Sequence, residues 1–217
     1  MSQPLGLRER KKQQTRQLIA DTARRLFAER SFEEVTVAEV ARAADVAEAT
    51  VFNYFPTKED LFYSGLEAFE DALLSAIRER DPGESVLAAF GRFVLEPRGL
   101  IAARDPDAVE HLAAISRVIT ESPALLAREQ RIFAGYTSSL ARELAQETRT
   151  RPDAIEPWVA ANALMGVHRA LVDYARRQIV AGTRNPRLAR QVRAQAKQAL
   201  AALERGLGAY AVRPPAA

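Results

Sequence analysis

The 217-residue sequence contains no cysteine and only two histidines. Without cysteine the chain cannot form disulfides, thiolate metal sites or a cysteine nucleophile. It also has no run of ~18 to 20 uninterrupted apolar residues, so we expect no membrane-spanning helix and no membrane partner. The first twelve residues lack the apolar core of a secretory signal peptide. Together these absences favour a cytoplasmic protein.

Sequence motifs typical of enzymes are missing as well. The chain has no phosphate-binding glycine loop, no H-E-x-x-H helix and no G-x-S-x-G elbow. Its two histidines, His111 and His168, lie far apart in the sequence. We therefore expect no catalytic residues, no metal and no cofactor. A helical enzyme with a carboxylate-based active site is the remote alternative, because paired carboxylates cannot be recognised from sequence.

Hydrophobic residues make up 47% of the chain, enough to bury a core in one or two compact domains. Alanine and leucine are abundant, β-branched alternation is nearly absent, and breakers such as Asp81-Pro82-Gly83 and Ser122-Pro123 recur between segments of helical length. This pattern predicts an all-α protein. The longer helices are expected at residues 8–29, 58–80, 84–103, 105–121, 123–148, 154–181 and 186–211.

The net charge of +3 conceals a strong segregation. Residues 1–25 carry seven basic and two acidic side chains, and residues 176–217 carry nine basic and one acidic. The middle of the chain is therefore acidic. A basic N-terminal segment indicates an anionic partner such as nucleic acid, whereas a solvated helix face is the plainer interpretation.

Residues 36–62 carry the most specific pattern. Thr36-Val-Ala-Glu39 is a capping box, which predicts that a helix begins at Val37. The apolar stripe of this helix lasts two turns, and a second short helix follows at about residues 47–53 before Phe55-Pro56-Thr57 ends it. Two short helices joined by a tight turn form a helix-turn-helix. Its second helix would enter the major groove of DNA through Glu48, Ala49, Thr50 and Asn53.

The segment Thr36 to Lys58, T-V-A-E-V-A-R-A-A-D-V-A-E-A-T-V-F-N-Y-F-P-T-K, resembles the DNA-binding core of the tetracycline-repressor (TetR) family. The resemblance covers about residues 10–65. It implies a homodimeric one-component transcriptional regulator, usually a repressor, that binds double-stranded DNA and is released by a small-molecule effector. Matched position by position, it assigns base contacts to Glu48, Ala49 and Thr50. It assigns phosphate contacts to Thr36, Phe52, Tyr54 and Lys58.

Three residues depart from the family pattern. Asp45 stands where the family usually has glycine, which predicts a strained or slightly altered turn, although aspartate tolerates left-handed backbone angles better than most residues. Ala47 replaces the usual serine cap of the recognition helix. Phe52 replaces the usual tyrosine and has no hydroxyl for a phosphate, so apolar contact with a sugar or a thymine methyl is what remains to it.

These patterns predict two domains. A DNA-binding domain is expected at residues 1–57, with a basic arm at residues 1–12, and a ligand-binding and dimerisation domain at residues 58–217. The arm is expected to be mobile and to reach phosphates or a minor groove, with a solvated terminus as the alternative. Its basic residues are Arg8, Arg10, Lys11 and Lys12.

The larger domain is expected to enclose a pocket for an apolar or aromatic effector, with plain core packing as the alternative for each residue. Without such a cavity, a protein partner would take the effector's place. The candidate lining residues are Phe69, Phe90, Phe93, His111, Leu112, Ile115, Arg117, Phe133, Tyr136, Met165 and His168.

Apolar faces on the helices at about 154–181 and 186–211 predict dimerisation through a four-helix bundle. Two-fold symmetry of such a dimer in turn predicts a palindromic operator. The candidate interface residues are Trp158, Leu164, Leu171, Tyr174, Leu188, Val192, Leu200 and Leu203.

Overall fold

The computed structural model describes residues 6–65, 67–96, 106–151, 153–184 and 186–207. Over these residues it contains helices and no strand, which confirms the all-α prediction. The chain divides into two compact units: residues 1–66 with 118–126 form the first, and residues 67–117 with 127–217 form the second. No helix in the described part of the chain is long and apolar enough to cross a membrane.

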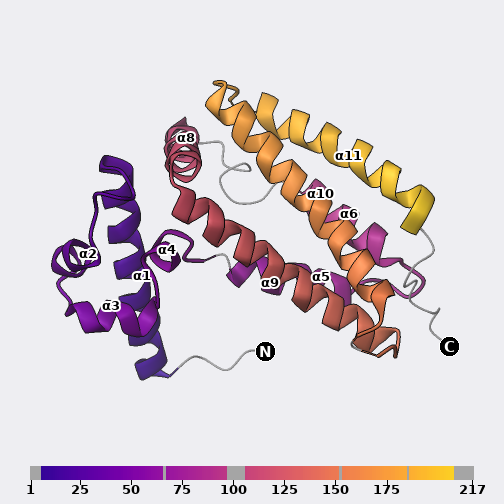
Figure 1. The fold of residues 1–217 in the computed structure, drawn as a ribbon, viewed down its shortest axis with the longest axis horizontal. Helices are drawn as coiled ribbons and strands as arrows, with labels where there is room; N and C mark the ends of the chain where they lie inside the picture. The colour runs from indigo at the N-terminus through magenta and orange to yellow at the C-terminus, as the bar shows by residue number, and fades with distance from the viewer. Residues whose placement is uncertain (1–5, 66, 97–105, 152, 185, 208–217) are drawn as a thin grey trace. The chain divides into compact units, whose positions relative to one another are not determined.

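The first unit contains four helices near the N-terminus: α1 (Leu7–Glu29), α2 (Val37–Ala43), α3 (Glu48–Tyr54) and α4 (Lys58–Phe62) (Figure 1). Helix α1 packs against α2 and α4, and α2 packs against α3. Because α2 and α3 have seven residues each, neither would be stable alone, and burial of their apolar faces holds them in place. The core of this unit includes Ile19, Ala23, Phe27, Val40, Ala41, Val51, Phe55 and Leu61.

Two capping boxes set where α2 and α4 begin, as predicted. The Glu39 backbone N–H donates to the Thr36 hydroxyl at 3.2 Å, and the Thr36 backbone N–H donates to the Glu39 carboxylate at 2.8 Å. Thr57 and Asp60 repeat this exchange at the start of α4. Helix α3 has no such cap, because the Ala47 methyl cannot accept a hydrogen bond.

The turn between α2 and α3 depends on Asp45, whose φ of 53° lies in the left-handed region. The Val46 backbone N–H donates to the Ala41 carbonyl oxygen at 3.0 Å, which closes the turn. Aspartate tolerates this conformation better than most residues. Asp45 therefore makes the turn for which glycine is usual.

The predicted single helix over residues 58–80 is wrong. Helix α4 ends at Phe62, and α5 (Glu67–Arg78) begins only after an interruption. Gly65 lies in the interruption with φ of 94°, a backbone angle incompatible with a right-handed helix. The first unit accordingly extends through α4 to residue 66, beyond the domain boundary predicted at residue 57.

The second unit contains α5, α6 (Val86–Leu95), α10 (Ile155–Val180) and α11 (Arg187–Leu207), with most of α8 (Pro106–Glu121) and α9 (Pro123–Glu147). Helix α6 packs against α5, α10 and α11, and α10 runs alongside α11 (Figure 1). The buried core of this unit includes Leu73, Ile77, Phe90, Tyr136, Leu140, Leu144, Leu164 and Met165.

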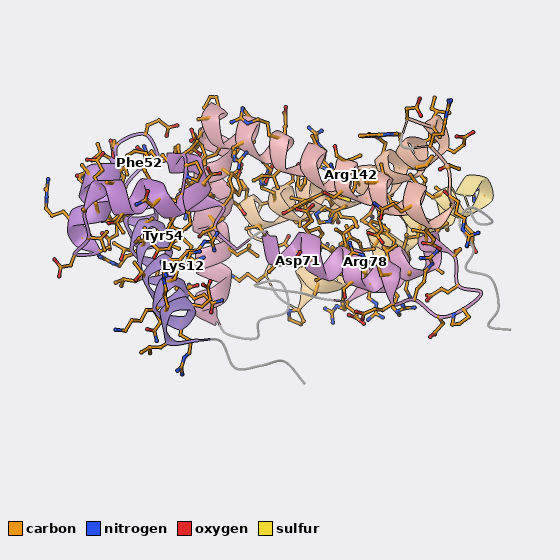
Figure 2. The ribbon with its side chains drawn as sticks, turned by 90° about the horizontal axis from the view of Figure 1, so that it is seen from below. Lys12, Phe52, Tyr54, Asp71, Arg78 and Arg142 are labelled. Carbon is orange, nitrogen blue, oxygen red and sulfur yellow. The ribbon has the colours of Figure 1, made fainter. Side chains whose placement is uncertain are left out.

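Two ion pairs join the end of α5 and the residues after it to α9. Arg78, labelled in Figure 2, pairs with Glu143 at 2.7 Å. The Arg80 guanidinium is only 1% exposed and donates to the Glu147 carboxylate at 2.8 Å and to the Ile77 carbonyl oxygen at 2.7 Å. A buried cation is tolerated because its N–H groups have such acceptors.

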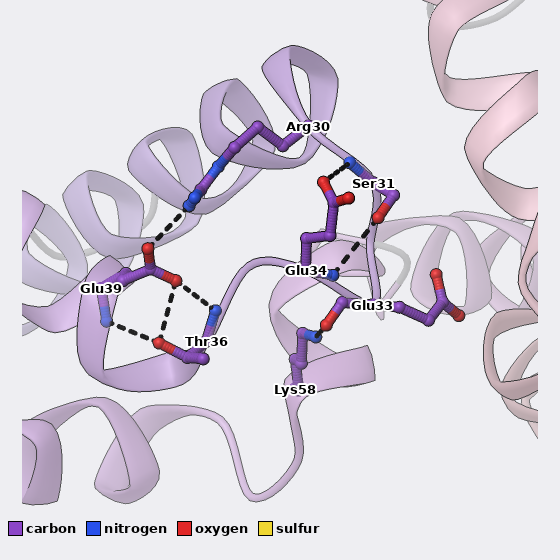
Figure 3. A network of polar contacts seen from close by, with 7 residues as sticks. All are labelled: Arg30, Ser31, Glu33, Glu34, Thr36, Glu39 and Lys58. Atoms are coloured by element: carbon purple, nitrogen blue, oxygen red, sulfur yellow. Dashed lines mark hydrogen bonds and ion pairs between the residues drawn. The ribbon is translucent and has the colours of Figure 1, made fainter.

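In the first unit, Glu39 is the centre of a polar network that includes Arg30 and Thr36 (Figure 3). The Thr36 backbone N–H, the Arg30 guanidinium and the Thr36 hydroxyl all donate to its carboxylate. These donors, the backbone N–H above all, stabilise the ionised form and lower the pKa of Glu39 from 4.5 to about 2.

The depressed pKa of Glu39 predicts a loss of stability in acid. Because the pKa is lower in the folded than in the unfolded state, the ionised carboxylate contributes fully above pH 4.5 and progressively less as the pH falls towards 2. Between pH 5.5 and pH 3, the melting temperature of the unaltered protein should therefore fall further than that of Glu39→Gln. Glu121→Gln, an exposed carboxylate at the end of α8, is the control and should keep the unaltered pH dependence. Equal falls in all three proteins would contradict the role of Glu39.

The uncapped start of α3 predicts that Ala47→Ser stabilises the protein. A serine hydroxyl at the N-cap accepts a backbone hydrogen bond and is worth roughly 1 kcal/mol, so thermal unfolding followed by circular dichroism should show a melting temperature a few degrees higher. Ala49→Ser, inside the same helix and without a cap role, should bring no gain. An unchanged or lower melting temperature for Ala47→Ser would count against the idea.

Candidate nucleic-acid interface

The face of α3 that carries the predicted base contacts is exposed. Glu48, Ala49, Phe52 and Asn53 lie at spacings of one, four and five residues, which puts them on one side of the helix, and all four are exposed. Val51, on the opposite side, is fully buried. Thr50 and Tyr54 are half-buried. The first turns of α3 are thus free to meet a partner.

The side chains on this face can distinguish bases. The Asn53 amide matches the donor and acceptor of adenine in the major groove, and the Glu48 carboxylate can accept from the amino group of cytosine. Phe52 is 46% exposed, unusually open for an aromatic residue (Figure 2). Its ring carries no polar atom, so a thymine methyl or a deoxyribose is the contact that suits it.

Lys58 lies over an aromatic cluster at the start of α4. Its ammonium group is 4.4 Å from the ring centre of Phe32 and 6.0 Å from that of Phe27, and it donates to the Glu33 carbonyl oxygen at 3.4 Å (Figure 3). Partial burial lowers the pKa of Lys58. Lys58 is therefore held in one place by contacts with its own chain.

Thr36 serves first as a helix cap. Its hydroxyl accepts from the Glu39 backbone N–H and donates to the Glu39 carboxylate at 3.0 Å. The hydroxyl proton is thus already used within the protein. A phosphate contact by Thr36 would have to displace this bond.

The basic residues expected in a mobile arm are helical instead. Arg8, Arg10, Lys11 and Lys12 belong to the first turns of α1 and are all exposed. The N-cap residue is Gly6, which has no side chain to cap the first backbone N–H groups of α1. Cations at a helix N-terminus are unfavourable to the helix dipole unless an anion is nearby, so phosphate is a fitting partner. Farther along α1, Arg16 lies 5.0 Å above the ring of Phe55.

Residues 118–126, at the junction of α8 and α9, belong to the first unit, which the sequence analysis missed. The buried Ser122 hydroxyl donates to the Glu33 carboxylate at 2.6 Å. The Tyr63 hydroxyl donates to the Leu125 carbonyl oxygen at 3.1 Å. Glu33 therefore accepts from both Ser122 and Lys58. The Ser122-Pro123 breaker marked this junction in the sequence, but nothing local to it indicated Glu33 as its partner.

A separate cavity of about 230 Å³ lies within the second unit. It is lined by residues of α5, α6, α10 and α11. Three predicted pocket residues, Phe69, Phe93 and His168, line it. Leu171 and Val192, expected at a subunit interface, line it too.

The remaining pocket candidates lie elsewhere. Phe90, Tyr136 and Met165 are buried in the core, and Phe133 packs against it. Leu112 packs on a smaller apolar cluster around Ile179, Ile115 is half-buried and Arg117 is exposed. The His111 side chain falls outside the described residues. The described residues among these lie in the core or at the surface and do not line this cavity, because helical spacing does not show which neighbour a side chain meets.

The dimer candidates divide in the same way. Leu164, Leu171 and Leu188 are buried within the chain's own core, while Tyr174, Val192, Leu200 and Leu203 are half-buried. Trp158 is 37% exposed. The large apolar side chains of α10 that are exposed are those of Ile155, Trp158, Val159 and Val180. A second subunit could contact these residues, whereas Leu164, Leu171 and Leu188 are already covered.

Residues 19–64 match the sequence model of bacterial regulatory proteins of the tetR family. The chain is 31% identical over 143 residues to the HTH-type transcriptional regulator TcmR of Streptomyces glaucescens, a match that covers 64% of this chain and 63% of TcmR. The chain thus spans less than two thirds of that relative's length.

Two solved structures share the fold. The transcriptional regulator FadR from Bacillus subtilis, solved in complex with stearoyl-CoA, has a TM-score of 0.51 at 20% identity, covering 85% of this chain and 97% of FadR. NalD, the secondary repressor of the MexAB-OprM multidrug efflux pump in Pseudomonas aeruginosa, has a TM-score of 0.54 at 19% identity, covering 91% of this chain and 97% of NalD. The family match over residues 19–64 contains the helix-turn-helix of α2 and α3 and shows a DNA-binding segment of the tetR type, and the two structures show that the chain shares their fold.

Proposed function

We propose that this protein is a homodimeric transcriptional repressor that binds a palindromic operator through α3 and leaves it when a small molecule binds the second unit. The exposed face of α3 carries the proposal, because Glu48, Ala49, Phe52 and Asn53 point away from the core on a helix that is otherwise held by burial. If this face of α3 were buried against the rest of the protein, its side chains could not contact the edges of DNA bases.

The cations around this face support contact with phosphate. The exposed basic residues of α1 and the pre-positioned Lys58 lie in the same unit as α3. Phosphate contacts fix the register of a protein on DNA, and base contacts then select the sequence. Thr36 and Tyr54 remain part of this proposal as phosphate contacts.

Release by a small molecule is supported by the cavity in the second unit, which a regulator controlled by a protein partner would not need. FadR is similar in fold and was solved with stearoyl-CoA, and NalD is described as a repressor. Helices α8 and α9 belong mainly to the second unit, yet their junction donates to Glu33 and accepts from Tyr63 in the first. We infer that ligand-induced movement of α8 or α9 acts on Lys58 through Glu33.

The test is selection of bound sequences from random duplexes at ~0.15 M salt, where nonspecific phosphate attraction is weakened. A palindrome with half-sites about one DNA turn apart is expected. Failure to enrich any sequence, with folding verified, would overturn sequence-specific binding. Enrichment of a single half-site would contradict the palindromic operator but would agree with base contacts by α3.

The exposed ring of Phe52 predicts that Phe52→Tyr tightens binding to the selected operator. A hydroxyl at this position can donate to a phosphate oxygen, and one such bond is worth about a fivefold change in Kd. Tyr54→Phe is the reciprocal variant and should weaken binding by a similar factor. Fluorescence anisotropy with a labelled operator measures both. A lower affinity for Phe52→Tyr would show that the position makes an apolar contact instead.

The dimer surface that we propose runs along the exposed side of α10. Ile155, Val159, Gly166 and Ala170 follow one another at helical spacing, and all are exposed. A Cβ atom on Gly166 would meet nothing within 4 Å. Its own chain therefore does not require glycine there, although a helical glycine costs up to ~1 kcal/mol relative to alanine. Close approach of a second α10 would explain it.

This surface predicts that Gly166→Arg separates the subunits. Analytical ultracentrifugation should show a dimer for the unaltered protein and at least a tenfold higher dissociation constant for the variant, because the long charged side chain keeps the two helices apart. Gly135→Arg is the matched control: Gly135 is an exposed mid-helix glycine on α9, also with open space around its Cβ position. Equal effects of the two variants, or a monomeric unaltered protein, would contradict the proposed interface.

A further inference from the structure

The cavity of the second unit has an aromatic wall. Phe69 and Phe93 meet edge to face with ring centres 5.4 Å apart. The His168 imidazole stacks on Phe69 at 4.4 Å with an angle of 24° between the planes. His168 also meets the Phe133 ring edge to face at 5.6 Å. Rings prefer such stacked and edge-to-face neighbours, so a flat aromatic guest can extend the same arrangement.

His168 is the polar group of this wall. Its ring lines the cavity and packs against the rings of Phe69 and Phe133. Burial lowers the pKa of His168 to about 4, so the imidazole is uncharged at neutral pH. A neutral imidazole has one N–H donor and one nitrogen acceptor. A guest hydroxyl can therefore exchange a hydrogen bond with one of the two ring nitrogens.

The other lining residues carry little net charge. Glu96 and Arg193 are the charged members among the described lining residues, they have opposite signs, and both side chains are exposed. The rest of the wall is apolar: Val94, Leu95, Leu171, Val172, Ala175, Ala189 and Val192. An ionised guest would lose its hydration here without a matching charge in the buried part of the wall.

The size of the cavity limits the guest. Its volume of about 230 Å³ is below the ~300 to 1,000 Å³ common for drug-sized ligands. A guest of one or two fused rings is the scale that fits this volume.

We propose that the cavity binds an uncharged aromatic molecule of one or two rings, with a hydroxyl group that exchanges a hydrogen bond with His168. This deepens the proposed function, because it names the class of effector to which the second unit responds. Phe69 and Phe93 supply the aromatic contacts, and His168 distinguishes the hydroxylated compound from the plain hydrocarbon.

Isothermal titration calorimetry of the full chain without DNA tests the proposal with four probes: 1-naphthol, naphthalene, decahydro-1-naphthol and 1-naphthoate. We expect 1-naphthol to bind about fivefold more tightly than naphthalene, the size of one net hydrogen bond. We expect decahydro-1-naphthol to bind more weakly because it is not aromatic, and 1-naphthoate more weakly because it is charged.

Two variants assign the contacts. His168→Phe keeps a ring against Phe69 but lacks the nitrogens, so it should bind naphthalene and lose the preference for 1-naphthol. Ala189→Leu narrows the cavity and should weaken both compounds. Circular dichroism verifies the fold of each variant. The comparison of the four probes in the unaltered protein does not depend on the two variants.

Equal affinity for naphthalene and 1-naphthol in the unaltered protein would overturn the role of His168. Tightest binding of 1-naphthoate would overturn the uncharged class, and tightest binding of decahydro-1-naphthol would overturn the aromatic one. Absence of binding by all four probes, up to their solubility, would overturn the cavity as a site for this class. Because DNA is absent from the titration, none of these results affects the operator selection, which tests the proposed function separately.

Discussion

The exposed face of α3 depends on the burial of apolar side chains beneath two helices that are too short to be stable alone. Helices α2 and α3 have seven residues each, and Val40, Val51 and Phe55 anchor them out of solvent. The capping box at Thr36 and the left-handed Asp45 set where α2 begins and how it turns into α3. Because one side of α3 is held in this way, its other side can remain exposed.

Polar contacts in the first unit connect this surface to a distant part of the sequence. Glu33 accepts from Lys58 through its carbonyl oxygen and from Ser122 through its carboxylate. Lys58 thus contacts a residue that also contacts the junction of α8 and α9. The proposed regulation connects the cavity of the second unit with the contacts of Glu33. The cavity is aromatic and mostly apolar, whereas the contacts of Glu33 are charged and hydrogen-bonded.

Local patterns predicted the helix-turn-helix well. Both capping boxes are formed, Glu48, Ala49 and Asn53 are exposed as the pattern required, and Ala47 makes no cap bond. The prediction failed where a helical pattern of apolar residues continued in the sequence although the helix itself is interrupted. Gly65 interrupts the single helix that was predicted over residues 58–80. Leu164 and Leu188 were predicted at a subunit interface but are buried within their own chain. An apolar helix face indicates that the face is buried, but it does not indicate which part of the protein covers it.

The sequence by itself determined the helical class, the start of α2 and α4 and which face of α3 is exposed, because these depend on hydrogen bonds and side-chain periods within a few residues. The tertiary structure alone decided that Lys58 lies over Phe32, that Ser122 contacts Glu33 and that His168 stacks on Phe69. Those contacts join residues 26, 89 and 99 positions apart. Their partners follow from how the helices pack, which no local pattern specifies.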